Sequence, residues 1–152
     1  YTSSTRNVVT QLQISYKVNM TAKITTSGSS ELHQIFSTLN DEGSFTFSVL
    51  TDSQGLAIAS SSKSGTDPDL QSAVVALVQK TVAQAGQRIG MAPAEEISVY
   101  TQNGQRLICR FFEASEYHLI LAVAVPEKDQ KYRRLTNQAI SQIGRIWTKY
   151  WK

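Results

Sequence analysis

The sequence has few of the residues from which proteins build catalytic or metal sites. It contains one cysteine, Cys109, and two histidines, His33 and His118, among 152 residues. A single cysteine excludes an internal disulfide, and no cysteine or histidine spacing typical of a zinc site is present. We therefore expect no bound metal. The unpaired thiol favours a reducing compartment, which predicts a cytoplasmic protein.

Long apolar runs and nucleotide-binding glycine motifs are also absent. No stretch approaches the roughly 20 apolar residues that a membrane-spanning helix needs, so we expect no membrane span. The first residues lack the basic start and apolar core of a secretion signal. The chain has eight glycines, but they form neither the phosphate-binding loop of nucleotide hydrolases nor the dinucleotide fingerprint. We accordingly expect no cofactor.

One pair of residues could in principle supply a nucleophile and a base, namely Cys109 and His118. Cys109, however, lies at an apolar-facing position of a predicted strand, where a buried and inert thiol is the usual case. No other combination of residues suggests a reaction. The sequence therefore predicts no catalytic residues and a protein that is not an enzyme.

What the chain does contain begins with a strict alternation near its start. Apolar residues occupy every second position from 12 to 24: Leu12, Ile14, Tyr16, Val18, Met20, Ala22 and Ile24. A period of two is typical of a strand with one buried face. We expect a long strand at about residues 10–25, within an N-terminal extension of residues 1–28. Gly28-Ser29-Ser30 then marks a break before a domain of residues 29–152.

The remaining patterns alternate between helical and strand periodicity. They predict a short helix near 32–39, a hairpin over 45–60, a middle helix over 67–89, three strands over 97–101, 107–111 and 118–125, and a last helix from about 129 to 150. Asp67, Pro68 and Asp69 suit the start of the middle helix, and Gly90 suits its end. The predicted inner stripe of that helix is Leu70, Ala73, Val74, Leu77, Val78, Thr81, Ala85 and Ile89.

This order predicts an α/β (α+β) fold. The simplest packing is a central antiparallel five-stranded sheet with helices on its faces, to which the extension adds an N-terminal strand. The nearly continuous apolar run from His118 to Val125 suits a central strand covered on both faces.

The positive charge is concentrated near the C-terminus. The chain has a formal charge of +3, whereas residues 126–152 alone carry seven basic and two acidic residues. A basic segment with aromatic residues could bind nucleic acid, the less favoured partner, or make peripheral contact with an anionic membrane surface. A solvated helix face is the simpler explanation of the composition. Candidate contact residues are Arg133, Arg134, Arg145, Lys149 and Trp151.

The hairpin at residues 47–60 reads FSVLTDSQGLAIAS. It has an apolar strand, an Asp-x-x-Gly turn at 52–55, and then apolar and small residues. This hairpin, the three-strand meander at 97–125 and the order of elements resemble the roadblock family, which includes dynein light chains and bacterial regulators of small GTPases. The resemblance covers about residues 31–147. The short first helix and the N-terminal extension depart from the usual module.

The resemblance implies a non-catalytic scaffold or regulator that forms a homodimer or heterodimer and binds a partner protein, with a Ras-like small GTPase as the expected partner. In the family, the middle helix and the first meander strand form the two-fold interface. Carried over to this chain, the interface residues are Val75, Ala76, Val82, Ile97, Val99, Tyr100 and Thr101. A small-molecule sensor is a further alternative, although the sequence shows no convergent polar groups that would mark a ligand pocket.

Overall fold

The computed structural model describes residues 26–62 and 67–151. The predicted strand at 10–25 therefore lies outside the described residues.

Five strands form one antiparallel sheet. They are β1 (Phe47–Asp52), β2 (Ala57–Ser62), β3 (Glu96–Tyr100), β4 (Arg106–Ala114) and β5 (Tyr117–Val125). Their order across the sheet is β2-β1-β5-β4-β3, so β2 and β3 are the two edges and β5 is the centre. This arrangement confirms the predicted sheet.

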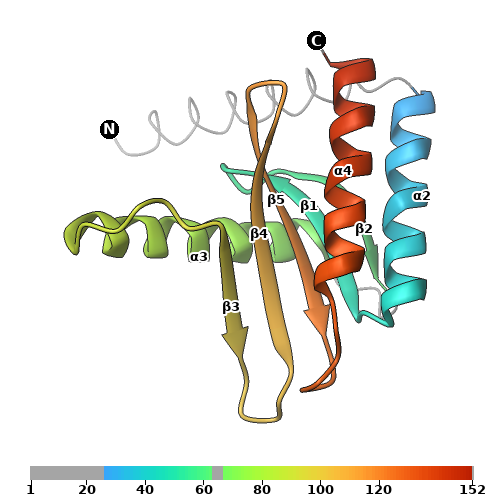
Figure 1. Ribbon diagram of the computed structural model, residues 1–152. Coiled ribbons are helices and arrows are strands. Elements are labelled where there is room, and N and C mark those ends of the chain that lie inside the picture. The colour runs from blue at the N-terminus through green and yellow to red at the C-terminus, as the bar shows by residue number, and fades with distance from the viewer. Residues whose placement is uncertain (1–25, 63–66, 152) are drawn as a thin grey trace, which may run out of the picture.

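Three described helices cover the two faces. Figure 1 shows α2 (Thr26–Gly43) and α4 (Arg133–Tyr150) side by side on one face, whereas α3 (Pro68–Arg88) crosses the other face and extends past β3. Each face has its own apolar core. Phe36, Phe45 and Trp147 are buried beneath α2 and α4. On the α3 side, Val49, Val75 and Cys109 form a smaller core.

The central strand β5 contributes to both cores. Its residue Leu121 packs on the α2 and α4 side, and Ile120 packs on the α3 side. Since both faces of β5 are covered from Leu119 to Val123, both sets of side chains there must be apolar. The prediction from the run at 118–125 is confirmed.

The first described helix is longer than the sequence suggested. It is already helical at Thr26, and Gly28-Ser29-Ser30 does not break it. A Cβ added to Gly28 would lie 3.1 Å from Cδ2 of Tyr150. Glycine here therefore permits a close approach of α2 to the end of α4 rather than a turn. The left-handed residue after the helix is Ser44, with φ 54°.

The ends of α3 are as predicted, but its buried face is not. Asp67 Oδ1 accepts a hydrogen bond from the Asp69 backbone N–H at 3.0 Å, and Gly90 has φ 75°. The predicted inner residues Leu70, Val74 and Leu77, however, are exposed.

Small residues explain the orientation of α3. The residues that it buries against the sheet are Ser72, Val75 and Ala76. A Cβ added to Gly55, in the β1–β2 turn, would lie 3.3 Å from the Cβ of Ala76. The small side chains let the helix pack close to this turn, and close packing maximises dispersion contacts. The larger aliphatic residues are consequently left outside.

The last helix begins later than expected. It starts at Arg133 rather than near Asp129, and its buried residues are Thr136, Ala139, Ile143 and Trp147. The residues before it form an irregular connection from β5, which Arg106 holds by hydrogen bonds to two of its backbone carbonyls.

Candidate interaction surface

The outer face of α3 carries a stripe of exposed aliphatic side chains. Leu70, Val74 and Leu77 are 62%, 47% and 64% exposed, respectively. Their spacing of four and three residues places them on one side of the helix. Large aliphatic side chains gathered on one exposed helix face are typical of interaction sites. We call these three residues the α3 stripe.

The edge strand β3 offers a second surface. Within the described part of the chain, β3 pairs only with β4, so the backbone groups on its outer side have no strand partner. Val99 lies opposite Leu107 and Tyr100 lies opposite Arg106, which places these two exposed side chains on opposite faces of the sheet. A free edge with exposed apolar residues is suited to pairing with another chain.

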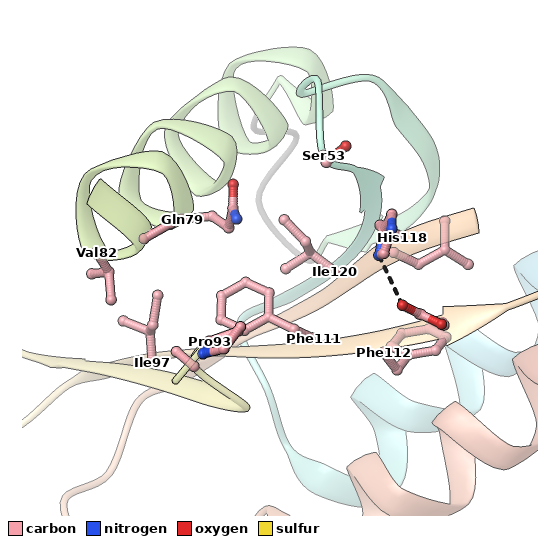
Figure 2. Close-up of a pocket in the computed structure, with 13 residues that line it drawn as sticks. Ser53, Gln79, Val82, Pro93, Ile97, Phe111, Phe112, His118 and Ile120 are labelled. Atoms are coloured by element: carbon pink, nitrogen blue, oxygen red, sulfur yellow. Dashed lines mark ion pairs between the residues drawn. The ribbon is translucent and has the colours of Figure 1, made fainter. Parts of the chain in front are cut away.

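A cavity of about 530 Å³ separates the C-terminal half of α3 from the sheet. Figure 2 shows Gln79 and Val82 on the helix side, and Ile97, Phe111 and Ile120 on the sheet side. At one end lie Ser53, and His118 and Glu113, whose Nδ1 and Oε1 atoms are 3.3 Å apart. No sequence pattern pointed to these polar groups, because they come from separate elements.

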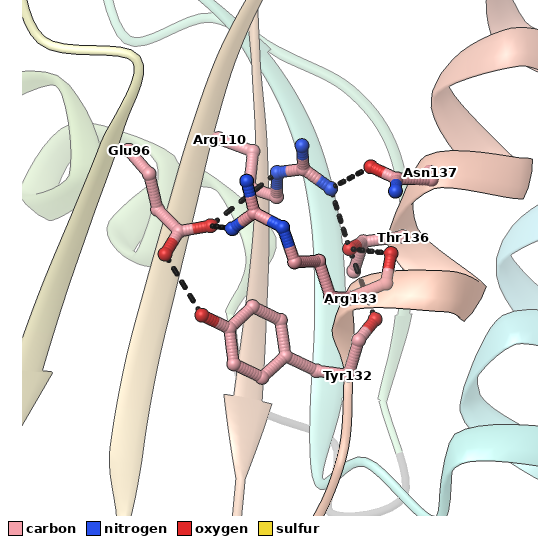
Figure 3. Close-up of polar contacts among 6 residues, drawn as sticks. All are labelled: Glu96, Arg110, Tyr132, Arg133, Thr136 and Asn137. Atoms are coloured by element: carbon pink, nitrogen blue, oxygen red, sulfur yellow. Dashed lines mark hydrogen bonds and ion pairs between the residues drawn. The ribbon is translucent and has the colours of Figure 1, made fainter.

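A polar cluster on the opposite face ties β3 to β4 and α4. Glu96 Oε1 lies 3.5 Å from Arg110 Nε and 3.3 Å from an Nη of Arg133. The Tyr132 hydroxyl donates a hydrogen bond to Glu96 Oε2 at 2.8 Å. Arg110 in turn donates to Thr136 Oγ1 at 2.9 Å and to Asn137. Figure 3 shows these six residues converging between the strands and the helix.

The partial burial of this cluster affects the ionisation of Tyr132. Desolvation raises the pKa of Tyr132, and the adjacent Glu96 carboxylate raises it further. The sequence did not reveal the cluster. Glu96 and Arg110 face each other in the β3–β4 register, and that pairing becomes visible only once the register is known.

The structure does not bring Cys109 and His118 together as a catalytic pair. Cys109 is buried opposite Ala122, whereas His118 is exposed opposite Glu113. Burial raises the pKa of the Cys109 thiol to about 12. The thiol is therefore protonated near neutral pH and is a poor nucleophile.

Metal-binding clusters and membrane-spanning helices are both absent from the described residues. No group of three or more histidine, cysteine or carboxylate side chains is placed to hold a metal ion there. No helix in the same part of the chain has the length and apolarity to cross a bilayer.

The structure corrects part of the interface predicted from sequence. Val75 and Ala76 are buried beneath α3 in the core of the same chain, so they are not outward residues. Val82 and Ile97 line the cavity under the helix. The remaining three, Val99, Tyr100 and Thr101, are exposed along β3 and the turn that follows it.

The predicted surface contacts near the C-terminus include both buried and exposed residues. Trp151 is buried and stacks on Trp147 with ring centroids 4.0 Å apart, so it is not a surface residue. The stack removes two large apolar surfaces from water, which explains its position. Arg134 and Arg145 are exposed, and Lys149 Nζ lies 3.5 Å from Glu31 Oε1.

Solved structures that resemble this chain in fold include the following three. MglB from Myxococcus xanthus gives a TM-score of 0.68 at 13% identity and covers 81% of this chain and 92% of its own. The gliding protein MglB from Thermus thermophilus gives 0.67 at 15% identity, with 82% and 94% covered. A Roadblock/LC7 domain from Streptomyces avermitilis gives 0.62 at 17% identity, with 77% and 95% covered.

The chain has a roadblock-family fold. No family profile and no curated protein sequence matches it, so at these low identities the likeness lies in the three-dimensional structure. In this fold, the chain presents both the α3 stripe and the free β3 edge to solvent.

Proposed function

We propose that this chain is a non-catalytic regulator or scaffold that forms a homodimer and, as a dimer, binds a Ras-like small GTPase. The observation that carries the proposal is the unpaired edge of β3, together with the exposed α3 stripe. Two copies related by a two-fold axis would pair their β3 strands and continue one sheet across the interface. The aliphatic stripes would be covered in the same assembly.

The exposed apolar side chains favour a dimer over a monomer, because a dimer would remove them from water. Fully burying one aliphatic side chain is worth about 1.5–3 kcal/mol. Leu70, Val74 and Leu77 contribute on both sides of a symmetric interface. The β3 backbone would gain hydrogen bonds in the same step.

The assembly is tested by light scattering after size-exclusion chromatography at high micromolar concentration. We expect a dimer for the unmodified chain. Val99→Lys should yield a folded monomer, because like charges would face each other across the paired strands. Leu70→Glu with Leu77→Glu should have the same effect through α3. Gln87→Glu, an exposed polar position on the same helix, should remain dimeric.

A monomer for the unmodified chain would end the dimer proposal. If both interface variants stay dimeric, copies associate through another surface. Circular dichroism would establish that each variant is folded.

The GTPase partner is proposed from the family resemblance alone. The chain lacks a nucleotide-binding loop of its own, so any effect on hydrolysis would come from ordering the GTPase's active site. The immobilised dimer should retain a guanine-nucleotide-binding protein from native lysate, and retention should differ between GDP and a non-hydrolysable GTP analogue. Equal retention in both nucleotides, or no such protein, would contradict this part of the proposal.

A further inference from the structure

A hollow with strongly basic walls lies where the chain passes from β5 into α4. Its volume is about 680 Å³. Five basic residues and one acidic residue line it: Arg106, Lys128, Lys131, Arg133, Arg134 and Asp129. We call this hollow the basic pocket. It is lined by the first residues of α4 and the connection before them, and α4 and α3 cover opposite faces of the sheet (Figure 1).

The positive charge of the basic pocket is poorly balanced by the chain itself. Arg133 pairs with Glu96. Arg106, Lys128, Lys131 and Arg134 form no ion pair within the described part of the chain. Like charges held around one hollow repel each other, so an anion bound there would be favourable.

The start of α4 adds to the imbalance. The first turn of α4 contains no acidic residue, and the residue at its N-cap, Tyr132, makes no side-chain capping hydrogen bond. The N-terminal end of a helix carries partial positive charge and favours anions. This helix instead begins with Arg133 and Arg134. The local sequence is therefore electrostatically unfavourable for the helix alone.

Arg106 forms a buried part of the wall. It is 8% exposed. Its guanidinium carbon lies 5.8 Å from the ring centre of Tyr100 and 5.5 Å from that of Tyr132. One Nη donates to the backbone carbonyls of Glu127 and Gln130, and Nε has no hydrogen-bond partner. The contacts to carbonyls hold the connection before α4 but supply no countercharge. A buried cation without a counter-ion is costly.

These observations favour one class of ligand. We propose that the basic pocket binds the phosphate groups of a small phosphorylated molecule. Guanidinium and ammonium groups are the side chains that recognise phosphate oxygens. The charges surround a single hollow instead of following a long groove, which favours a compact ligand over a nucleic-acid strand. An anion at this point would also offset the repulsion at the start of α4.

The proposal is tested by titrating the full chain with sodium triphosphate in an isothermal calorimeter at low ionic strength. We expect saturable binding at one site per chain. Lys131→Gln with Arg134→Gln should weaken it by about tenfold or more, since each charged contact to phosphate is strong. The control, Arg145→Gln with Lys149→Gln, removes the same charge at exposed positions of α4 outside the pocket. It should change affinity less than about twofold, as distant charges are screened.

Equal weakening in both double variants would show that only net charge matters and would overturn the site. The absence of saturable binding at millimolar triphosphate would overturn it too. Thermal unfolding separates lost binding from lost folding. Triphosphate should raise the Tm of the unmodified chain but not that of the Lys131→Gln, Arg134→Gln variant. Without ligand, this variant should be at least as stable as the unmodified chain, because repulsion is removed.

A second measurement distinguishes a soluble ligand from a lipid headgroup. Co-sedimentation with phosphatidylcholine vesicles containing about 5–10% of a phosphoinositide, a loading chosen for the anionic-surface effect, should show no gain over vesicles of phosphatidylcholine alone. Strong vesicle binding that is lost in Lys131→Gln with Arg134→Gln would contradict the small-molecule source. These outcomes are independent of the dimer, whose test uses variants on α3 and β3.

Discussion

The hydroxyl of Tyr132 donates a hydrogen bond to Glu96 Oε2 at 2.8 Å, and this contact joins the residue before α4 to the edge strand β3. The other oxygen of Glu96 faces Arg110 and Arg133. One carboxylate thus connects β3, β4 and α4. Because β3 is held at its N-terminal end from its own chain, its outer edge can be presented in a fixed position.

Replacing Glu96 should therefore destabilise the protein. Glu96→Gln keeps the size of the side chain but leaves the largely buried Arg110 without its carboxylate partner. Breaking a partly buried charge pair in this way should lower the free energy of unfolding by about 2 kcal/mol. Urea unfolding followed by circular dichroism measures the change.

Glu95→Gln is the matched control for Glu96→Gln. Glu95 is exposed, and it contacts β4 through its backbone, where its carbonyl accepts a hydrogen bond from the Phe111 N–H. Its substitution should change stability by less than about 0.5 kcal/mol. If the two variants unfold at the same urea concentration, the cluster around Glu96 contributes little to stability.

The elements of the fold were predictable from sequence because each has a local cause. Alternation identified the strands, and Asp67 and Gly90 marked the ends of α3. The orientation of α3 was not predictable in the same way. Counting apolar residues favoured the stripe that contains Leu70 and Leu77, but close packing at Gly55 selected the face with small residues. Helix periodicity defines faces without stating which one the sheet accepts.

The candidate surfaces likewise contain residues that the sequence could place and residues that it could not. Val99 and Tyr100 could be placed on an exposed edge from the order of the strands. The basic pocket could not, because Arg106 lies 21 residues before Glu127, whose carbonyl it contacts. A charge count located an excess of basic residues after 126 but not the hollow around which they gather. The stacking of Trp151 on Trp147 depends on the direction in which the chain leaves α4. The sequence does not show that direction, so it predicts Trp151 on the surface.

The turn between β1 and β2 should depend on Gly55. Its φ of 89° is in the left-handed region, and an added Cβ would lie 3.3 Å from the Cβ of Ala76. Gly55→Ala should lower the free energy of unfolding by about 1–2 kcal/mol. Gly144→Ala provides the contrast, because nothing lies within 4 Å of its added Cβ and it is inside α4. That substitution should stabilise the protein by up to about 1 kcal/mol. Thermal unfolding should therefore give a lower Tm for Gly55→Ala and a higher Tm for Gly144→Ala than for the unmodified protein.

The aromatic stack at the end of α4 should contribute to stability. Trp151 is nearly fully buried, and its ring is inclined by only 12° to that of Trp147. Trp151→Ala should cost about 3 kcal/mol, as expected for removing a large buried aromatic side chain. Lys149→Ala, two residues earlier and exposed, should have little effect. A Trp151→Ala protein with unchanged urea midpoint would mean that the stack does not hold the C-terminal turn in solution.

The buried thiol of Cys109 gives a prediction about pH. Burial raises its pKa to about 12, so the folded state binds the thiol proton more tightly than the unfolded state does. The stability that this group contributes is complete below its ordinary pKa of 9.0 and falls as the pH rises toward 12. The urea midpoint of the unmodified protein should therefore decrease more steeply from about pH 9 upward, toward pH 12, than that of Cys109→Ala. Equal slopes would contradict a buried, protonated thiol, as would rapid alkylation of the folded protein by iodoacetamide at about pH 8.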